Sequence, residues 1–233
     1  DANLSGVDLS GLSLVNTILT GANLTGTNLT GATLLGVTSG GITGTPAALP
    51  TGFVVTAGYL VGPGVNLAGA NLTGADLTGA DLTGTDLTGA DLTGVTLTGA
   101  TLQNADLSAA FLTGVISGGI TGTPASLPAG TVVANGYLVG LGVNLAGADL
   151  TAADLSGVDL TGVDLTGAVL TGADLAGAKL ASTALAGVTS GGITGTPASL
   201  PAGTLIANGY LVGPVANLAG ASLAGADLTG VDL

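Results

Sequence analysis

The sequence predicts an all-β protein whose chain winds into a tube of stacked coils. Three observations lead to this class: leucine at every fifth position over most of the chain, glycine at the end of most five-residue units, and a nearly non-aromatic apolar composition. Of the 233 residues, 44 are glycine, 46% are hydrophobic and only 2% are aromatic. A chain this apolar is not expected to be disordered, and its core must be built from leucine, valine and alanine.

The five-residue period fits neither regular element of secondary structure. An α-helix repeats every 3.6 residues and a β-strand every two, so leucines five residues apart would not stay on one side of either. They stay on one side only if the chain turns by an equal angle in each unit, and glycine suits such a corner. The leucine and the small residue two positions before it then face inward, and the polar residues beside the leucine face outward. The period alone leaves the number of sides per coil open.

The unit Ala80-Asp81-Leu82-Thr83-Gly84 represents the repeated motif. In this motif the sequence resembles the pentapeptide-repeat proteins. The resemblance covers residues 2–36, 65–114, 143–187 and 216–233. It implies a right-handed quadrilateral parallel β-helix with four pentapeptides in each coil. The resemblance implies much less about function, because the functions of this family vary widely.

Three similar cassettes interrupt the repeats, at about residues 37–64, 115–142 and 188–215. The second and third contain Asn135-Gly136 and Asn208-Gly209 between β-forming residues, which is a strong hairpin signal. We expect three β-hairpin insertions that leave the tube and rejoin it, within a single continuous solenoid over residues 1–233. The two intervals between cassette starts differ by one pentapeptide. In a four-sided coil the hairpins would therefore not all project from one face.

Composition excludes several functional classes. The chain has no Cys or His, which removes disulfides, zinc sites of the usual kind and Cys/His or Ser/His catalysis. It carries 14 acidic residues and one basic residue, for a net charge of −13, which disfavours binding to nucleic acids or anionic membranes. No apolar run approaches the roughly 18 residues of a spanning helix. We therefore expect no enzyme activity, no catalytic or metal-binding residue, no cofactor and no membrane insertion.

Outward-facing acidic residues are the first candidate for a functional surface. They form an outer ladder of Asp76, Asp81, Asp86, Asp91, Asp106, Asp149, Asp154, Asp159, Asp164 and Asp174. Aspartate at such positions bonds the nearby backbone at turns and keeps a protein soluble. The family resemblance adds a second interpretation, because some members mimic DNA and bind gyrase.

Five aromatic residues are the second candidate. We expect Tyr59, Tyr137, Tyr210, Phe53 and Phe111 to take part in interaction or self-assembly. Phe111 occupies an outward position just before the second cassette. It is expected to lie under that cassette or in an intermolecular contact, unless it is simply a tolerated exposed side chain.

The two ends of the sequence suggest a role. The repeat is already in register at Leu4, and Leu233 is itself the centre of a unit, with no capping segment at either end. Solenoids normally need caps, so we expect either a segment of a longer chain or a subunit that stacks end to end. The leading hypothesis is a rigid spacer, stalk or filament segment of a bacterial secreted or cell-surface protein that associates with itself. The alternative is a protein-binding module, either a cytoplasmic gyrase-binding DNA mimic or an adhesin that binds a protein or glycan through its cassettes.

Overall fold

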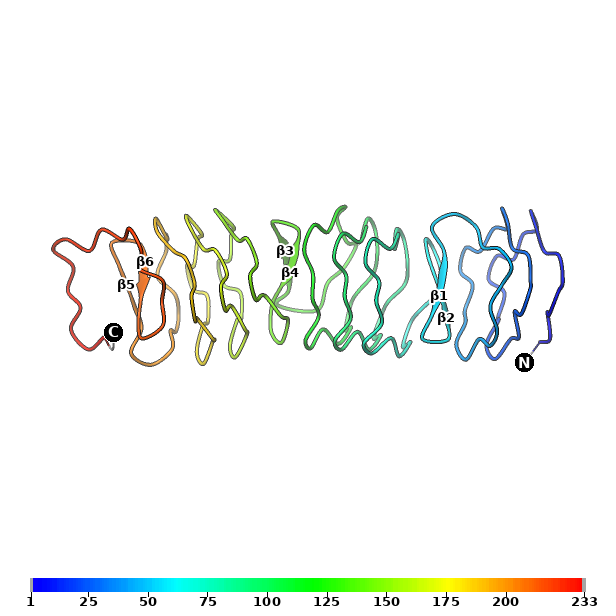
Figure 1. The fold of residues 1–233 in the computed structure, drawn as a ribbon, viewed down its shortest axis with the longest axis horizontal. Coiled ribbons are helices and arrows are strands. Elements are labelled where there is room, and N and C mark those ends of the chain that lie inside the picture. The colour runs from blue at the N-terminus through cyan, green and yellow to red at the C-terminus, as the bar shows by residue number, and fades with distance from the viewer. Residues whose placement is uncertain (1, 232–233) are drawn as a thin grey trace. The chain divides into compact units, whose positions relative to one another are not determined.

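The computed structural model describes residues 2–231 of the 233-residue chain. All regular structure in this part of the chain is β-structure, and no helix there is long and apolar enough to cross a membrane. The chain forms two compact units. Unit 1 comprises Asp1–Leu112 and Ile120–Ala129, and unit 2 comprises Thr113–Gly119 and Gly130–Leu233. Figure 1 shows the successive coils that make up each unit.

Backbone pairing in unit 1 shows that each regular coil has four sides. Parallel bridges join residues 20 positions apart, such as Asn3 to Asn23 and Asp8 to Asn28. Each side contributes a single bridge, in which the Leu4 amide donates to the Asn23 carbonyl at 2.9 Å and the Asn23 amide donates to the Ala2 carbonyl at 2.9 Å. Four pentapeptides therefore complete one coil, as the family resemblance implied.

The corners between sides are β-turns closed by one backbone hydrogen bond. At the first corner the Val7 amide donates to the Leu4 carbonyl at 3.0 Å, and Gly6, the third residue of the turn, has φ of 68°. A positive φ at that place is the requirement of a type II turn, which explains the glycine at the end of most units. The non-glycine residues found at corner positions also have positive φ; they are Asn16, Asn104, Ala109, Ala152 and Ser182.

The core of each coil is filled by the repeated leucine and by the small residue two positions before it. Leu72, Leu82 and Leu165 are completely buried, and Ala90 and Ala168 are also completely buried. Three buried threonines replace alanine at the small position, and each hydroxyl donates to a carbonyl of the preceding coil. These bonds join Thr27 to Leu4, Thr85 to Gly62 and Thr183 to Leu160.

Each cassette contains one antiparallel hairpin with three residues in each strand. The hairpins pair β1 (Val54–Thr56) with β2 (Tyr59–Val61), β3 (Val132–Ala134) with β4 (Tyr137–Val139), and β5 (Leu205–Ala207) with β6 (Tyr210–Val212). The two turn residues between the strands have positive φ in all three hairpins, including Ala57 at 49° and Asn135 at 48°. This is the geometry of the type I′ turn that Asn-Gly favours.

The hairpins do not leave the tube, which differs from the expectation drawn from the sequence. In unit 1 the start of the cassette still follows the coil, because Thr43 pairs with Asn23 and Ala48 pairs with Asn28. The coil that begins at Thr38 then takes 28 residues, in place of 20, to return to the same side at Asn66. The eight additional residues equal the length of the hairpin from Val54 to Val61.

The first hairpin lies between two successive coils as an additional layer. On one side the Ile42 amide donates to the carbonyl of Gly58 at the hairpin turn, at 2.9 Å. On the other side the Asn71 amide donates to the Tyr59 hydroxyl at 3.1 Å. Leu60 is completely buried. A two-stranded hairpin alone is marginal in water, so packing inside the stack accounts for its stability.

Unit 2 repeats this arrangement. Two of its bridges join residues 28 positions apart, Ile116 to Asn144 and Thr189 to Asn217, although residues 120–129 of the second cassette belong to unit 1. Ile116 pairs with Asn144, which pairs in turn with Asp164 on the same side of the coil. Thr189 pairs with Val169, which lies one pentapeptide after Asp164 and therefore on the neighbouring side. The second and third hairpins therefore start from neighbouring sides of the coil, a quarter turn apart.

Candidate interaction surfaces of the coils

The outward aspartates are fixed by hydrogen bonds to their own backbone. The Asp91 carboxylate accepts from the Thr93 amide at 3.0 Å, and the Asp106 carboxylate accepts from the Ser108 amide at 2.9 Å. Asparagine makes the same bond, since the side-chain oxygen of Asn71 accepts from the Thr73 amide at 3.1 Å. Asp or Asn at this position therefore closes an Asx-type turn before each corner.

These bonds also stabilise the charged form of the carboxyl groups. Hydrogen bonds from the hydroxyl and the amide of the Thr or Ser two positions later hold the pKa of the carboxyls below the ordinary value, because they favour the ionised state. The groups affected in this way are Asp76, Asp91, Asp106, Asp149, Asp154, Asp159, Asp164 and Asp227. The pKa of Asp8 is lowered as well, by the bond from the Ser10 amide first and then by that from its hydroxyl.

The acidic ladder is divided among several sides of the coils. Only some aspartates stack on one another, as Asp86 does on Asp106 and Asp154 on Asp174. Others stack on a neutral residue, as Asp91 does on Phe111. Among residues 2–231 no three acidic groups lie close enough together to hold a metal ion.

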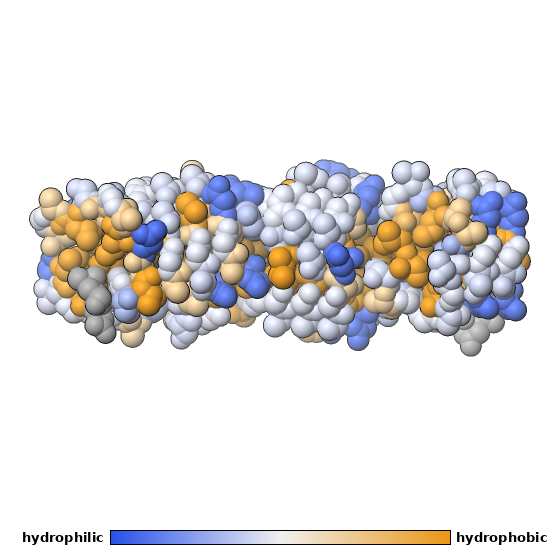
Figure 2. Space-filling model, in the orientation of Figure 1, coloured by the Kyte–Doolittle hydropathy of each residue, from blue (hydrophilic) through white to orange (hydrophobic). Residues whose placement is uncertain are grey.

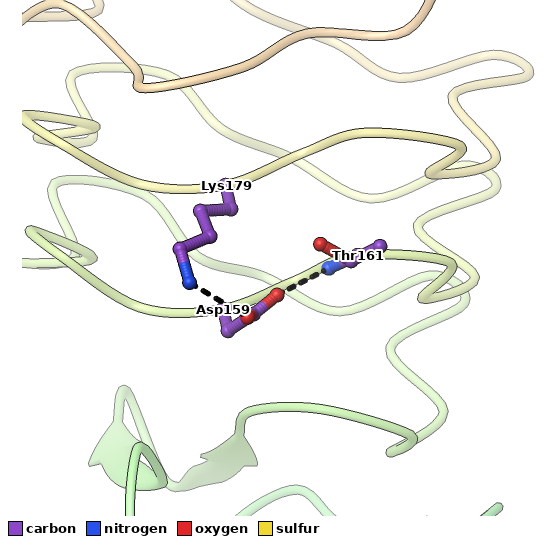
Figure 3. A network of polar contacts seen from close by, with 3 residues as sticks. All are labelled: Asp159, Thr161 and Lys179. Carbon is purple, nitrogen blue, oxygen red and sulfur yellow. Dashed lines mark hydrogen bonds and ion pairs between the residues drawn. The ribbon is translucent and has the colours of Figure 1, made fainter.

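The one lysine of the chain neutralises one of these carboxylates. The ammonium nitrogen of Lys179 lies 3.2 Å from Oδ2 of Asp159 on the preceding coil, while Oδ1 of Asp159 accepts from the Thr161 amide at 3.0 Å (Figure 3). The hydrogen bonds from Thr161 and then that from Lys179 lower the pKa of Asp159. Both side chains are partly exposed, so the pair contributes little to stability.

The three tyrosines form part of the hairpin layers. Tyr59, Tyr137 and Tyr210 lie against Gly40, Gly118 and Gly191, respectively, the first glycine of the Ser-Gly-Gly sequence in each cassette. The Tyr137 hydroxyl accepts from the Asp149 amide at 3.3 Å, as Tyr59 does from Asn71. Tyr59 and Tyr137 thus join each hairpin layer to the following coil. The part of the three tyrosines in binding a partner stays a prediction.

The turn residue Asn135 makes a second connection of this kind. Its side-chain amide donates to the Thr151 carbonyl at 2.8 Å and to the Asp149 carbonyl at 3.3 Å. Asn208 makes the corresponding bonds, to Ser222 and Ala224, in the third cassette. Asparagine therefore does more than form the turn, because it bonds the next coil.

The two phenylalanines have different environments. Phe53 is half-buried and packs against the core of unit 1, beside Gly62. Phe111 is 61% exposed, so it is not covered by the second cassette, which was one of the expectations for it. Its role in an intermolecular contact stays a prediction.

Apolar side chains other than Phe111 are exposed as well. In unit 1 they include Ile18, Leu35 and Val54, at 73%, 57% and 46% exposure. Figure 2 shows apolar surface over the coils beside the first hairpin. The signal for Leu35 was its place directly after the repeated leucine, where most units have Thr, Ser or Ala.

A shallow cleft of about 270 Å³ lies beside the first hairpin. Phe53 and Val54 line it on the hairpin side, and Asp76 and Asp81 line it on the side of the next coil. It combines apolar and acidic groups, so it suits an apolar group that carries positive charge better than an anion.

Comparison with known proteins gives a family-level match. The family model described as pentapeptide repeats matches in eight copies, over residues 1–36, 64–99, 75–114, 142–188 and 216–233. No curated protein matches the sequence.

Several solved structures are similar to this chain. HetL, a pentapeptide-repeat protein involved in heterocyst differentiation regulation in Nostoc sp. strain PCC 7120, is 24% identical, with 85% of this chain and 84% of HetL covered and a TM-score of 0.25. Full-length QnrB1, a plasmid-mediated fluoroquinolone resistance protein, is 17% identical, with 100% and 89% covered and a TM-score of 0.22. Rfr23 from the cyanobacterium Cyanothece 51142 is 17% identical, with 85% and 87% covered and a TM-score of 0.20.

Proposed function

Because the chain belongs to the pentapeptide-repeat family, we propose that it is a non-catalytic structural protein whose coils act as a rigid spacer, stalk or end-to-end stacking filament segment. The proposal places it in a bacterial secreted or cell-surface protein, where such a segment would hold other domains apart or join copies of itself.

The continuous hydrogen bonding between the coils of each unit is the observation that supports this role. Asn28 illustrates it, because its amide donates to Val7 of the preceding coil at 3.0 Å and its carbonyl accepts from Leu9 at 2.8 Å. In repeat proteins each layer contacts only its neighbours, so stiffness accumulates layer by layer. The hairpin layers continue this bonding, since each of them is bonded to the coils beside it.

Electron microscopy of the purified protein, with small-angle scattering on the same sample, tests the spacer role. Straight particles of uniform length are expected, and in the stacking form their lengths should be multiples of one unit length. Compact or strongly bent particles would contradict the spacer role. Fractionation of the source cells with an antibody against the chain tests its location, and recovery in the cytoplasm alone would contradict secretion.

A protein-binding module is the second candidate. The observation that favours it is the surface of unit 1, which carries exposed apolar and acidic side chains and contains no Lys or Arg. Such a surface favours a partner with basic residues. For the gyrase-binding form of this hypothesis, inhibition of DNA supercoiling at micromolar protein is expected, and its absence would remove that form. For the adhesin form, binding should be lost on substitution of Val54 or Leu35 and kept on substitution of the exposed Ser10.

A further inference from the structure

The first and third cassettes share a set of identical residues, called the framework here, that surrounds one position at which the two cassettes differ. Positions 151 residues apart are identical at four places around this framework, namely Leu34 and Leu185, Pro50 and Pro201, Gly62 and Gly213, and Pro63 and Pro214. At the centre of the framework the first cassette has Phe53 and the third has Thr204.

In the first cassette the phenylalanine ring fills the framework. Phe53 packs against the core of unit 1, and a methyl group added at Gly62 would overlap its ring. The backbone holds the ring in place, because the Phe53 amide donates to the Pro50 carbonyl at 3.2 Å. Glycine at position 62 is thus the counterpart of the large side chain at position 53.

In the third cassette the same framework has a hole. The Thr204 amide donates to the Pro201 carbonyl at 3.2 Å, as Phe53 does to Pro50, so the backbone follows the same course. The shorter threonine side chain leaves a pocket of about 90 Å³, whose walls include Leu185, Pro214 and Val215.

The chemistry of the pocket defines what it can bind. Its walls are mainly apolar side chains, and the Thr183 hydroxyl at its edge already donates to the Leu160 carbonyl at 2.8 Å. No polar ligand is required to satisfy that group. The first cassette shows that a phenylalanine ring suits this framework, and burial of a phenyl group in an apolar pocket is favourable.

The chain has two phenylalanines, and only one of them fills a pocket in its own unit. The other, Phe111, is 61% exposed on unit 1. We propose that Phe111 of one molecule inserts into the Thr204 pocket of a second copy of this chain. This contact rests on the proposed self-association but uses the side of the coils in place of their ends. Because the two surfaces differ, the contact is heterologous and can propagate from molecule to molecule.

The contact is weak for physical reasons. One aromatic side chain buries roughly 150–250 Å², whereas stable interfaces bury about 1,200 Å² or more. Each copy also carries a net charge of −13, so the copies repel one another at low salt. Screening shortens this repulsion, to a Debye length of about 3 Å at 1 M salt. Association is therefore expected at high protein concentration and to increase with salt.

Sedimentation equilibrium of the full chain in 1 M NaCl, over a concentration series, tests the proposal. Wild type is expected to form a concentration-dependent series of oligomers. Phe111→Ala and Thr204→Phe, the second of which fills the pocket, should each weaken the association at least tenfold. Ile18→Ala, which removes another exposed apolar side chain, is the matched control and should leave the association unchanged.

Mixing the two variants gives the sharpest result. Phe111→Ala retains the pocket and Thr204→Phe retains the projecting ring, so an equimolar mixture should form dimers and no larger species. If both variants associate as strongly as wild type, the proposal is overturned. The oligomers that remain would then be consistent with stacking at the ends. Loss of association in Ile18→Ala to the same degree also overturns it, because the contact would then be unspecific.

A binding measurement covers the case in which Thr204→Phe fails to fold. N-acetyl-phenylalaninamide added to the wild-type chain should shift the methyl resonances of Leu185 and Val215, at millimolar concentration. Shifts confined to other methyl groups, or the absence of any shift, would overturn the assignment of the pocket.

Discussion

The hydroxyl oxygen of Ser39 lies 2.9 Å from the backbone nitrogen of Leu60, from which it accepts a hydrogen bond inside the coil stack. The same bond joins Ser117 to Leu138 at 3.0 Å and Ser190 to Leu211 at 2.9 Å. One serine in each cassette thus satisfies the amide of a completely buried leucine in the hairpin layer.

Replacing this serine tests how the hairpin is held. In Ser39→Ala the buried Leu60 amide loses its partner, and an unpaired buried donor costs about 1–3 kcal/mol. The free energy of unfolding in urea should fall by that amount, while Ser10→Ala on the exposed surface should change it by less than about 0.5 kcal/mol. Equal effects of the two substitutions would show that the bond is not important for stability.

The contact between Gly40 and Tyr59 predicts a position that accepts only glycine. Gly40 has φ of 149°, and a Cβ atom there would lie 3.1 Å from Cε1 of Tyr59. Gly40→Ala should therefore destabilise the protein by about 2–3 kcal/mol, because backbone strain and the ring contact act together. Gly74→Ala is the control, since its φ of 67° is strained but the space around it is open.

A double substitution separates the two causes in Gly40→Ala. In a Tyr59→Ala background only the backbone strain remains, so the effect of Gly40→Ala measured by thermal and urea unfolding should decrease. An unchanged effect would mean that the tyrosine ring plays no part in the selection of glycine.

The hydrogen-bonded aspartates predict a dependence of stability on pH. Bonds from Thr78, Thr93 and Ser108 lower the pKa of Asp76, Asp91 and Asp106 in the folded chain below the ordinary value of 3.8. A carboxyl with a lower pKa in the folded state stabilises the fold above its unfolded pKa, and this stabilisation is lost as pH falls through the folded pKa. These three groups should therefore lower the stability of the fold as pH falls below about 4.

Asparagine at the same three positions separates charge from turn formation. The triple variant with Asn at 76, 91 and 106 keeps an acceptor for the turn, as Asn71 shows, but cannot titrate. Its unfolding free energy in urea should vary less than that of wild type between pH 5 and pH 2.5. A triple variant whose pH dependence equals that of wild type would assign the dependence to other groups.

Exchanging the residues at positions 53 and 204 should change stability in opposite directions. Phe53→Thr leaves a hole in unit 1 and should cost about 2–3 kcal/mol. Thr204→Phe places a ring in a pocket of about 90 Å³ that is open to solvent on one side, and partial burial of the ring should stabilise unit 2 by about 1 kcal/mol. Thermal unfolding of both variants checks this, and destabilisation by Thr204→Phe would show that the third framework cannot hold a ring.

Much of the fold could be predicted from the sequence because one pattern is repeated many times. The period of five predicted equal sides and a closed core, and the buried Leu82 and Ala90 lie where that pattern places them. The number of sides did not follow from the period. It followed from the family resemblance, and the 20-residue spacing of bridges such as that from Asn71 to Asp91 confirms it.

Local sequence signals could not predict that the hairpins pack between coils. Asn135-Gly136 correctly indicated a turn, but a turn signal does not say whether the strands beside it project or pack. A usable signal was present in the first cassette, where Val37, Ile42 and Ala47 continue the five-residue spacing. That spacing leaves only a short excess of chain, and a short two-stranded hairpin is marginal in water unless it packs against the coils.

The candidate site residues were predictable in position but not in environment. The outward direction of Asp91 follows from the repeat, whereas its hydrogen bond to Thr93 depends on the turn geometry. The contact of Tyr59 with Gly40 joins residues of one cassette that lie 19 positions apart, and no periodic pattern connects them. The pocket at Thr204 became visible only by comparison with the Phe53 framework.

The 28-residue coil has a consequence for how genes of this kind can change. Because Thr38 and Asn66 lie on the same side of the coil, the hairpin layer does not change which side each downstream pentapeptide occupies. An in-frame insertion or deletion of five codons between two cassettes would rotate the next hairpin by a quarter turn and preserve every contact within it. Any other small change of length would turn the following leucines toward solvent. Four orientations of a hairpin are therefore compatible with an unchanged hairpin layer.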